Sequence, residues 1–246
     1  MYFPVDLVKG EIVKCYKNLI LDVRTVSGEL VSAFCPELDA KQNMYVPGAE
    51  VWLLPNETGR HLKYETLMVN KGEGMVMISP VYTERLMEEA FADGLLADFA
   101  AYDSLRRIEA SDSVSYANLI FTNSHEEKCF VYAVTIYNKQ GGNVVFPTFI
   151  NFFEMEMFRE FAKLRQEGHE TRVVLIVPRS DCAGIKFTWN ISPVAAAKIF
   201  DEAKNGLKFC GYGCTINAQS VKIIQELEIL GKIFIFILGL ERWLSG

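Results

Sequence analysis

Two apolar, strand-like segments stand close together in the middle of this chain. They read S-Y-A-N-L-I-F at Ser115–Phe121 and C-F-V-Y-A-V-T-I-Y at Cys129–Tyr137. Short apolar runs rich in β-branched and aromatic residues are typical of buried strands. The two segments therefore predict neighbouring central strands of a sheet, around which the rest of the fold has to be arranged.

The size and charge of the chain narrow the classes of function. It has 246 residues, of which 50% are hydrophobic, which is enough for one large domain or two small ones. Its net charge is −6 and its pI is about 5.3. Proteins that hold nucleic acid mainly through phosphates are strongly basic. Any nucleic-acid contact in this chain is therefore expected to be local.

The cysteines and the apolar segments indicate the cellular compartment in which the protein is expected. The six cysteines are scattered, without the closely spaced pairs of a structural zinc site. The first residues, M-Y-F-P-V-D-L, lack the basic and apolar regions of a secretory signal, so we expect a cytoplasmic protein. The longest apolar stretch, Ile233–Leu238, is far shorter than the ~20 residues of a membrane-spanning helix, so no membrane partner is expected.

The first 80 residues carry a rhythm of short strands. Turn signals at Ser27-Gly28 and Pro47-Gly48 separate segments with strand-like composition. Five such strands in so short a stretch predict a small barrel of the oligonucleotide-binding (OB) type. The expected strands are Glu11–Val23, Glu29–Phe34, Glu50–Leu54, Lys63–Val69 and Gly74–Ile78.

Helices enter the pattern beyond Ser79-Pro80. Ser192-Pro193 supplies an N-cap and a first-turn proline for a helix that Gly206 ends. Alternating helices and strands predict a mixed α/β domain whose sheet is covered by helices. The expected helices are Thr83–Phe91, Asn151–Gln166 and Val194–Asn205, and the further strands are Arg172–Val177 and Leu207–Tyr212.

Several local strings, in their order along the chain, resemble the sugar fermentation stimulation protein family. The similarity covers roughly residues 10 to 216 and depends on order more than on any one string. The strings are C-Y-K-N-L-I-L-D-V at Cys15–Val23, F-C-P at Phe34–Pro36, Pro47-Gly48 with Val51-Trp52, S-L-R-R-I-E at Ser104–Glu109, C-F-V-Y-A-V-T-I at Cys129–Ile136, Phe146-Pro147, Arg179, Asp181 and Phe187, and A-K-N-G-L at Ala203–Leu207.

This resemblance implies a fold and a class of activity. The family is associated with DNA binding, is thought to contain metal-dependent nucleases, and is named for a proposed role in regulating sugar metabolism. The implied fold is α/β (α+β), with an N-terminal OB-like β-barrel followed by a restriction-endonuclease-like mixed α/β domain. We accordingly expect a barrel at residues 1–80, the nuclease-like domain at 81–226 and an apolar C-terminal extension at 227–246.

The catalytic pattern of the family is not kept in the two central strands. The family has serine, arginine, a hydrophobe and aspartate in the first, and glutamate, a hydrophobe and lysine in the second. Here Asn118 replaces the aspartate, Tyr132 the glutamate and Val134 the lysine. Magnesium favours hard oxygen ligands, chiefly carboxylates. We therefore expect no catalytic residues, no bound metal or other cofactor, and an inactive nuclease domain.

The barrel offers residues that could contact nucleic acid. Lys14, Lys17 and Arg24 are cations that can meet phosphates, and Tyr16 has an aromatic face that can stack on a base. The acids Glu37 and Asp39 oppose DNA electrostatically. We therefore predict that these four residues bind nucleic acid weakly, with DNA as a possible partner. The alternative is an ordinary barrel surface with Tyr16 packed in the core.

Two further alternatives remain open. A divalent-metal-dependent nuclease with relocated ligands would need Mg²⁺ and would draw on Glu109, Asp112, Glu154 or Glu156. A protein-interaction scaffold would use the aromatic helix Phe149–Phe161 or the C-terminal tail. Since this helix is apolar on most sides, we expect it either to fill the former catalytic cleft or to face a protein partner.

Overall fold

The structure is a computed structural model. It describes residues 1–16, 20–35, 45–56, 62–70, 72, 74–147, 152–188 and 192–230, with the backbone alone at 152–154. The chain forms two compact units, each built from segments that are distant in sequence. The barrel unit contains Met1–Tyr82, Pro178–Asp181 and Cys214–Lys222, and the mixed α/β unit contains Thr83–Val177, Cys182–Gly213 and the residues from Ile223 onward.

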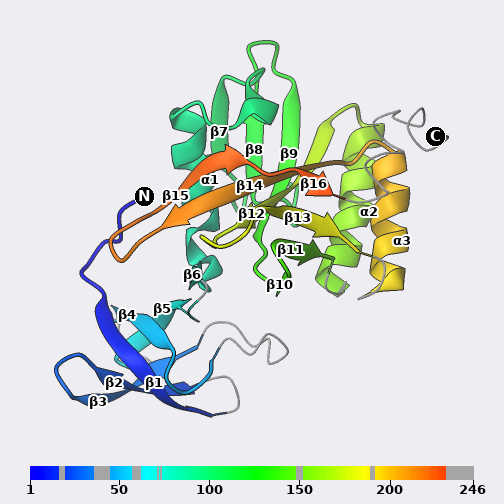
Figure 1. The fold of residues 1–246 in the computed structure, drawn as a ribbon. Coiled ribbons are helices and arrows are strands. Elements are labelled where there is room, and N and C mark those ends of the chain that lie inside the picture. The colour runs from blue at the N-terminus through cyan, green and yellow to red at the C-terminus, as the bar shows by residue number, and fades with distance from the viewer. Residues whose placement is uncertain are drawn as a thin grey trace. The chain divides into compact units, whose positions relative to one another are not determined.

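The barrel unit confirms the predicted OB-like barrel. Its strands follow the order β3-β2-β1-β4-β5-β6, and a parallel pairing of β3 with β5 closes the first five strands (Figure 1). Inward-facing residues such as Ile12, Leu21 and Val23 are buried in the core. The strands are β1 (Val8–Tyr16), β2 (Ile20–Thr25), β3 (Leu30–Phe34), β4 (Glu50–Pro55), β5 (Tyr64–Asn70) and β6 (Met75–Met77).

One predicted strand of the barrel was wrong. The segment Glu11–Val23 was expected as a single strand, but it belongs to two antiparallel strands, β1 and β2, with Tyr16 paired to Ile20. The sequence between them, K-N-L, contains neither glycine nor proline. Apolar alternation continues on both sides of this reversal, so the pattern gave no sign of a turn.

The mixed α/β unit has a six-stranded sheet in the order β15-β14-β12-β9-β8-β7. β12 runs parallel to both β9 and β14, while β7, β8 and β9 pair antiparallel. The elements, with the preceding turn of the barrel unit, are η2 (Pro80–Tyr82), α1 (Thr83–Ala92), η3 (Ala97–Phe99), β7 (Ser104–Arg107), β8 (Leu119–Thr122), β9 (Lys128–Thr135), α2 (Phe152–Gln166), β12 (Glu170–Val177), α3 (Pro193–Lys204), β14 (Lys208–Ile216) and β15 (Val221–Glu226).

A second sheet of four short strands follows the order β10-β11-β13-β16. Sequence analysis did not predict these strands. The first of them, β10 (Lys139–Gln140), pairs with β11 (Asn143–Phe146) across a two-residue glycine turn. β13 (Gly184–Phe187) pairs with β16 (Ile229–Leu230), which lies in the expected C-terminal extension. The remainder of that extension, residues 231–246 with Ile233–Leu238, lies outside the described residues.

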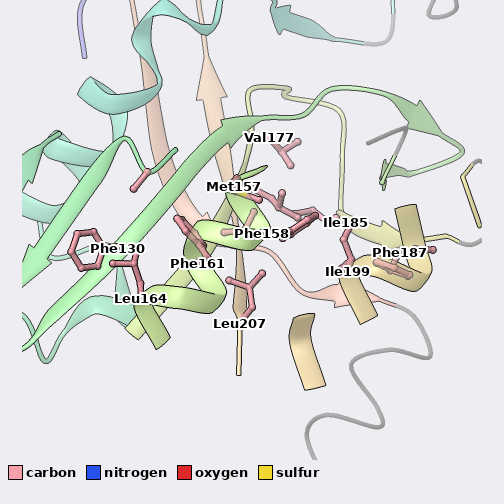
Figure 2. Packing of buried hydrophobic residues seen from close by; sticks show 14 of the residues in the cluster. Phe130, Met157, Phe158, Phe161, Leu164, Val177, Ile185, Phe187, Ile199 and Leu207 are labelled. Carbon is pink, nitrogen blue, oxygen red and sulfur yellow. The ribbon is translucent and has the colours of Figure 1, made fainter. Parts of the chain in front are cut away.

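Helix α2 supplies the centre of the hydrophobic core. Met157, Phe158, Phe161 and Leu164 face inward from it and belong to one buried cluster (Figure 2). The same cluster contains the alternate residues Val173, Leu175 and Val177 of β12 and Ile199 of α3. Burial of α2 was one of the two expected outcomes. The helix buries its apolar side, while Arg159 and Lys163 lie on an exposed polar side.

Two aromatic side chains of α2 are not accessible to a protein partner. Phe158 and Phe161 are 3% and 0% exposed. These two described aromatic residues of the predicted interaction helix therefore serve the core of their own unit. Phe149 lies outside the described residues.

Within the part of the chain that the structure describes, no helix has the length and apolar character needed to cross a membrane.

Candidate functional site

The side chain of Asn118 is bound to the backbone of the neighbouring strand. It lies just before β8, and its backbone N–H donates to the carbonyl of Val131 at 2.9 Å. Its Nδ2 donates to the carbonyl of Ala133 at 2.8 Å, and its Oδ1 accepts from the Ala133 N–H at 2.8 Å. Because Ala133 presents one donor and one acceptor, it fixes which way the amide points.

A carboxylate of α1 also reaches this amide. Glu84 is half-buried, and its Oε1 lies 3.3 Å from Asn118 Nδ2. One turn further along α1, Glu88 accepts two hydrogen bonds from Arg107 of β7, at 2.6 and 2.7 Å. Hydrogen bonding by Arg107 holds the pKa of the Glu88 carboxyl below its ordinary value. Asn118 is thus flanked by an acidic helix face, part of which Arg107 neutralises.

The other two positions of the family pattern are apolar in their surroundings. Tyr132 and Val134 are partly buried and pack against the core cluster of α2. The three positions therefore offer an amide whose oxygen is already used, a phenol and an alkyl group. Divalent cations such as Mg²⁺ and Ca²⁺ are held by carboxylates, carbonyls and water. These residues do not fit the metal that the fold family implies.

The acids considered as relocated metal ligands are engaged elsewhere or exposed. Asp112 accepts two hydrogen bonds from Arg106, each of 2.8 Å, and one from the backbone of Glu109. Glu109 itself is exposed, and Glu156 pairs with Arg159. The side chain of Glu154 lies outside the described residues. In the described part of the chain, no three His, Cys, Asp or Glu side chains gather as metal ligands would.

Strand β8 begins later than predicted, because of a contact that sequence analysis missed. The carboxylate of Glu160, on α2, accepts the N–H groups of Ser115 and Tyr116, both at 2.9 Å. These residues were predicted to lie in a strand, but β8 begins only at Leu119. Since Glu160 satisfies the two backbone donors, Ser115 and Tyr116 need no strand partner.

The predicted nucleic-acid residues that are described lie on the outward side of the barrel. Lys14, Tyr16 and Arg24 are all exposed, while Lys17 lies outside the described residues. The ammonium of Lys14 stands 4.5 Å from the centre of the Tyr16 ring. Tyr16 is 40% exposed, so the alternative that packs it in the core is wrong.

Strand register adds two residues to Tyr16 that sequence analysis had not selected. Tyr16 pairs with Ile20, and Ile20 pairs with Phe34, which forms a row across β1, β2 and β3. Ile20 and Phe34 are 37% and 39% exposed. We call these three residues the exposed row. Adjacent large apolar side chains that remain exposed form a candidate binding surface.

An acid beside the exposed row is satisfied within the barrel. Asp22 accepts a hydrogen bond from the Tyr16 hydroxyl at 2.7 Å and another from Ser32 at 2.8 Å. The first of these bonds holds the Tyr16 ring in place. The two hydroxyl dipoles partly offset the negative charge of Asp22, which weakens its repulsion of an approaching anion. The row is thus an anchored aromatic and apolar strip with cations nearby.

Comparisons with known proteins agree with this fold. The family model described as "Sugar fermentation stimulation protein RE domain" matches residues 81–220. Sugar fermentation stimulation protein homologues from Maricaulis maris and Paramagnetospirillum magneticum are 29% and 28% identical to this chain, covering 93% of it and 98% of each relative. The solved structure of Pyrococcus furiosus SfsA in complex with Ca²⁺ has a TM-score of 0.77 at 15% identity, covering 94% of this chain and 98% of that one. The chain therefore belongs to the sugar fermentation stimulation protein family.

Proposed function

We propose that this protein binds single-stranded nucleic acid along the outward face of β1, β2 and β3 and does not cleave it. The observation that carries the proposal is the exposed row of Tyr16, Ile20 and Phe34. Proteins that bind single strands combine aromatic side chains, on which bases stack, with cations that follow the backbone. Lys14 and Arg24 supply such cations on the same face.

The charge of the whole chain favours single strands over duplex DNA. With a net charge of −6, the protein lacks a broad basic surface for duplex phosphates. A single strand exposes its bases, so part of the binding free energy comes from stacking on Tyr16 and Phe34. Each stacked base contributes about 1–3 kcal/mol. Binding through a few local contacts suits a regulatory protein that occupies a strand without processing it.

The absence of cleavage is supported by the replaced pattern in the α/β unit. Nuclease chemistry of this class uses a divalent cation to stabilise charge on the phosphate. The Pyrococcus furiosus relative is in complex with Ca²⁺. In this chain the three pattern positions are Asn118, Tyr132 and Val134, whose side chains do not replace carboxylates and a lysine. We therefore propose that the domain has kept its fold and lost its reaction.

The thiols support a cytoplasmic location. The six cysteines form no disulfide, and four of them are buried. Because thiols persist in a reducing compartment, we propose that the protein is cytoplasmic. Nucleic acid is available there as its partner.

Fluorescence anisotropy with a labelled oligodeoxythymidine tests the binding. We expect binding that weakens as salt rises from about 50 to 200 mM and that exceeds binding to a duplex of the same length. Tyr16→Ala and Phe34→Ala should each weaken it about 5- to 150-fold, which corresponds to the loss of one stacked base. Tyr2→Ala is the matched control, because Tyr2 is an exposed tyrosine of the same unit with Lys222 near its ring.

Two results would overturn this proposal. If Tyr16→Ala and Phe34→Ala bind the oligonucleotide as the unchanged protein does, the exposed row is not the binding face. If the unchanged protein cuts the oligonucleotide with Mg²⁺ or Mn²⁺, and a chelator stops the cutting, the domain has an active metal site. Mass spectrometry of the oligonucleotide after incubation distinguishes intact from cleaved strands.

A further inference from the structure

Two oxygen atoms from different elements converge on the amide nitrogen of Asn118. The carbonyl oxygen of Ala133, on β9, lies 2.8 Å away, and Oε1 of Glu84, on α1, lies 3.3 Å away. We propose that this nitrogen takes the place of a divalent cation, so that Glu84 and the Ala133 carbonyl are cation ligands satisfied by a side chain. On this proposal the two oxygen ligands are still in place, and hydrogen bonds from Asn118 keep cations from binding to them.

The donors of the site support this assignment. A carboxylate oxygen and a backbone carbonyl oxygen are both preferred ligands of Ca²⁺ and Mg²⁺. A third oxygen, Oδ1 of Asn118, is on the same side chain but accepts from the Ala133 N–H. The two hydrogens on this nitrogen carry partial positive charge toward Glu84 and Ala133, which is what a cation would supply. One neutral NH₂ group therefore meets the needs of both oxygens.

A single substitution exchanges the nitrogen for an oxygen. In Asn118→Asp the side chain keeps the oxygen that accepts from Ala133 but can no longer donate to the Ala133 carbonyl or to Glu84. Three oxygens would then face one another without a hydrogen between them, and two of them would belong to carboxylates. Like charges so placed repel. A divalent cation would remove the repulsion and complete the ligand set with water.

Arg107 is a cationic side chain that interacts with Glu84, but it does not fill this need. Arg107 feels the charge of Glu84, but its hydrogen bonds go to Glu88, which is also the largest cause of its raised pKa. The carboxylate of Glu84 instead meets the Asn118 amide. The carboxylate that would bind a cation is therefore Glu84, and Glu88 keeps its structural pair with Arg107.

Thermal unfolding in EDTA and in about 10 mM Ca²⁺ tests the proposal. The variant Asn118→Asp should melt below the unchanged protein in EDTA, and Ca²⁺ should raise its melting temperature by about 3 °C or more, as expected for a dissociation constant near 1 mM. The unchanged protein should show no such shift. Adding Glu84→Gln to the variant should abolish the shift, since glutamine restores a donor. Adding Glu89→Gln, on the same helix, should leave the shift in place.

Calorimetric titration with Ca²⁺ provides a second measurement. Saturable binding to Asn118→Asp, weakened at least about tenfold by Glu84→Gln, is the expected result. The proposal is overturned if Asn118→Asp shows no Ca²⁺ response, or if it stays unfolded with and without Ca²⁺. It is also overturned if the unchanged protein binds Ca²⁺ in a manner that depends on Glu84. Oligonucleotide binding through the barrel is expected to be equal in all these variants, so this outcome is separate from the proposed function.

Discussion

The guanidinium of Arg165, near the end of α2, donates to the carboxylate of Glu202 on α3, with 2.6 Å between Nη2 and Oε2. The side chains are 12% and 7% exposed. Arg165 also donates to the hydroxyl of Thr171 on β12, and Lys198 donates to Glu202. One ionic network thus connects the two helices, which lie side by side, to the central sheet (Figure 1).

Removing the acid of this network should destabilise the protein strongly. Glu202→Ala leaves the largely buried Arg165, whose side chain is 12% exposed, without its carboxylate. Removing one partner of a buried pair costs about 3–5 kcal/mol. Urea unfolding of the purified variant measures this change. Asp201→Ala, at the exposed neighbouring position, is the control and should change the free energy of unfolding by less than about 0.5 kcal/mol. Equal stability of the two variants would contradict the prediction.

The fold could be predicted from sequence wherever the apolar pattern was long and residues that start or end a helix or strand marked its limits. Ser192 and Pro193 correctly marked the start of α3, and Gly206, at φ 94°, follows its C-cap. The short strands β11 and β13 were missed because four residues carry too little pattern to separate a strand from a loop. Glu11–Val23 was read as one strand for the opposite reason, since its pattern runs on without a break.

The candidate site could be predicted only in part. The resemblance to the family already implied that Asn118 and Tyr132 stand at positions where the family has carboxylates. The bonds between Asn118 and Ala133 are not, because they depend on the register of two strands. The reach of Glu84 depends on where α1 packs, and the exposed row depends on which residues of β2 and β3 lie opposite Tyr16. Contacts that join separate elements carry no local signal along the chain.

The carboxylate of Glu170 should make stability depend on pH. Burial raises its pKa, but hydrogen bonds from Lys208 and Arg172 outweigh this, so the pKa lies below the ordinary value of 4.5. A lowered folded-state pKa contributes stability above pH 4.5, and the contribution is lost as the pH falls through the folded-state pKa. The group is partly exposed, so solvent screens the effect.

Comparison of Glu170→Gln with the unchanged protein tests this dependence. At pH 7 the variant should unfold at a lower urea concentration, because Arg172 and Lys208 lose the negative charge and one of the two acceptor oxygens that they share. The difference should shrink as the pH falls below about 4.5 and the carboxyl of the unchanged protein gains a proton. Glu226→Gln removes the same charge at an exposed position and controls for net charge. A difference that grows on acidification would disprove the assignment.

The buried thiols should resist alkylation in the folded protein. Burial raises the pKa of Cys129 to about 12 and that of Cys214 to about 12. The thiolate is the reactive form, so at pH 8 both should stay unmodified by iodoacetamide. The half-buried Cys15 and Cys182 should react first, and all six should react in guanidinium. Peptide mass spectrometry identifies the modified sites, and early labelling of Cys129 would be inconsistent with its burial.

The aromatic side of α2 should respond to mutation as a core and not as a binding surface. Phe161 is fully buried between α2 and the sheet (Figure 2), so Phe161→Ala should lower the free energy of unfolding by about 3–5 kcal/mol through lost contacts and a cavity. Phe161→Leu keeps most of the volume and should cost less. Arg159→Ala, on the exposed side of the same helix, should have little effect.

An interface residue would behave differently: its truncation would leave the isolated protein as stable as before and would weaken only the bound state. Urea unfolding of these three variants therefore decides whether the described aromatic side chains of α2 stabilise this unit or serve a partner.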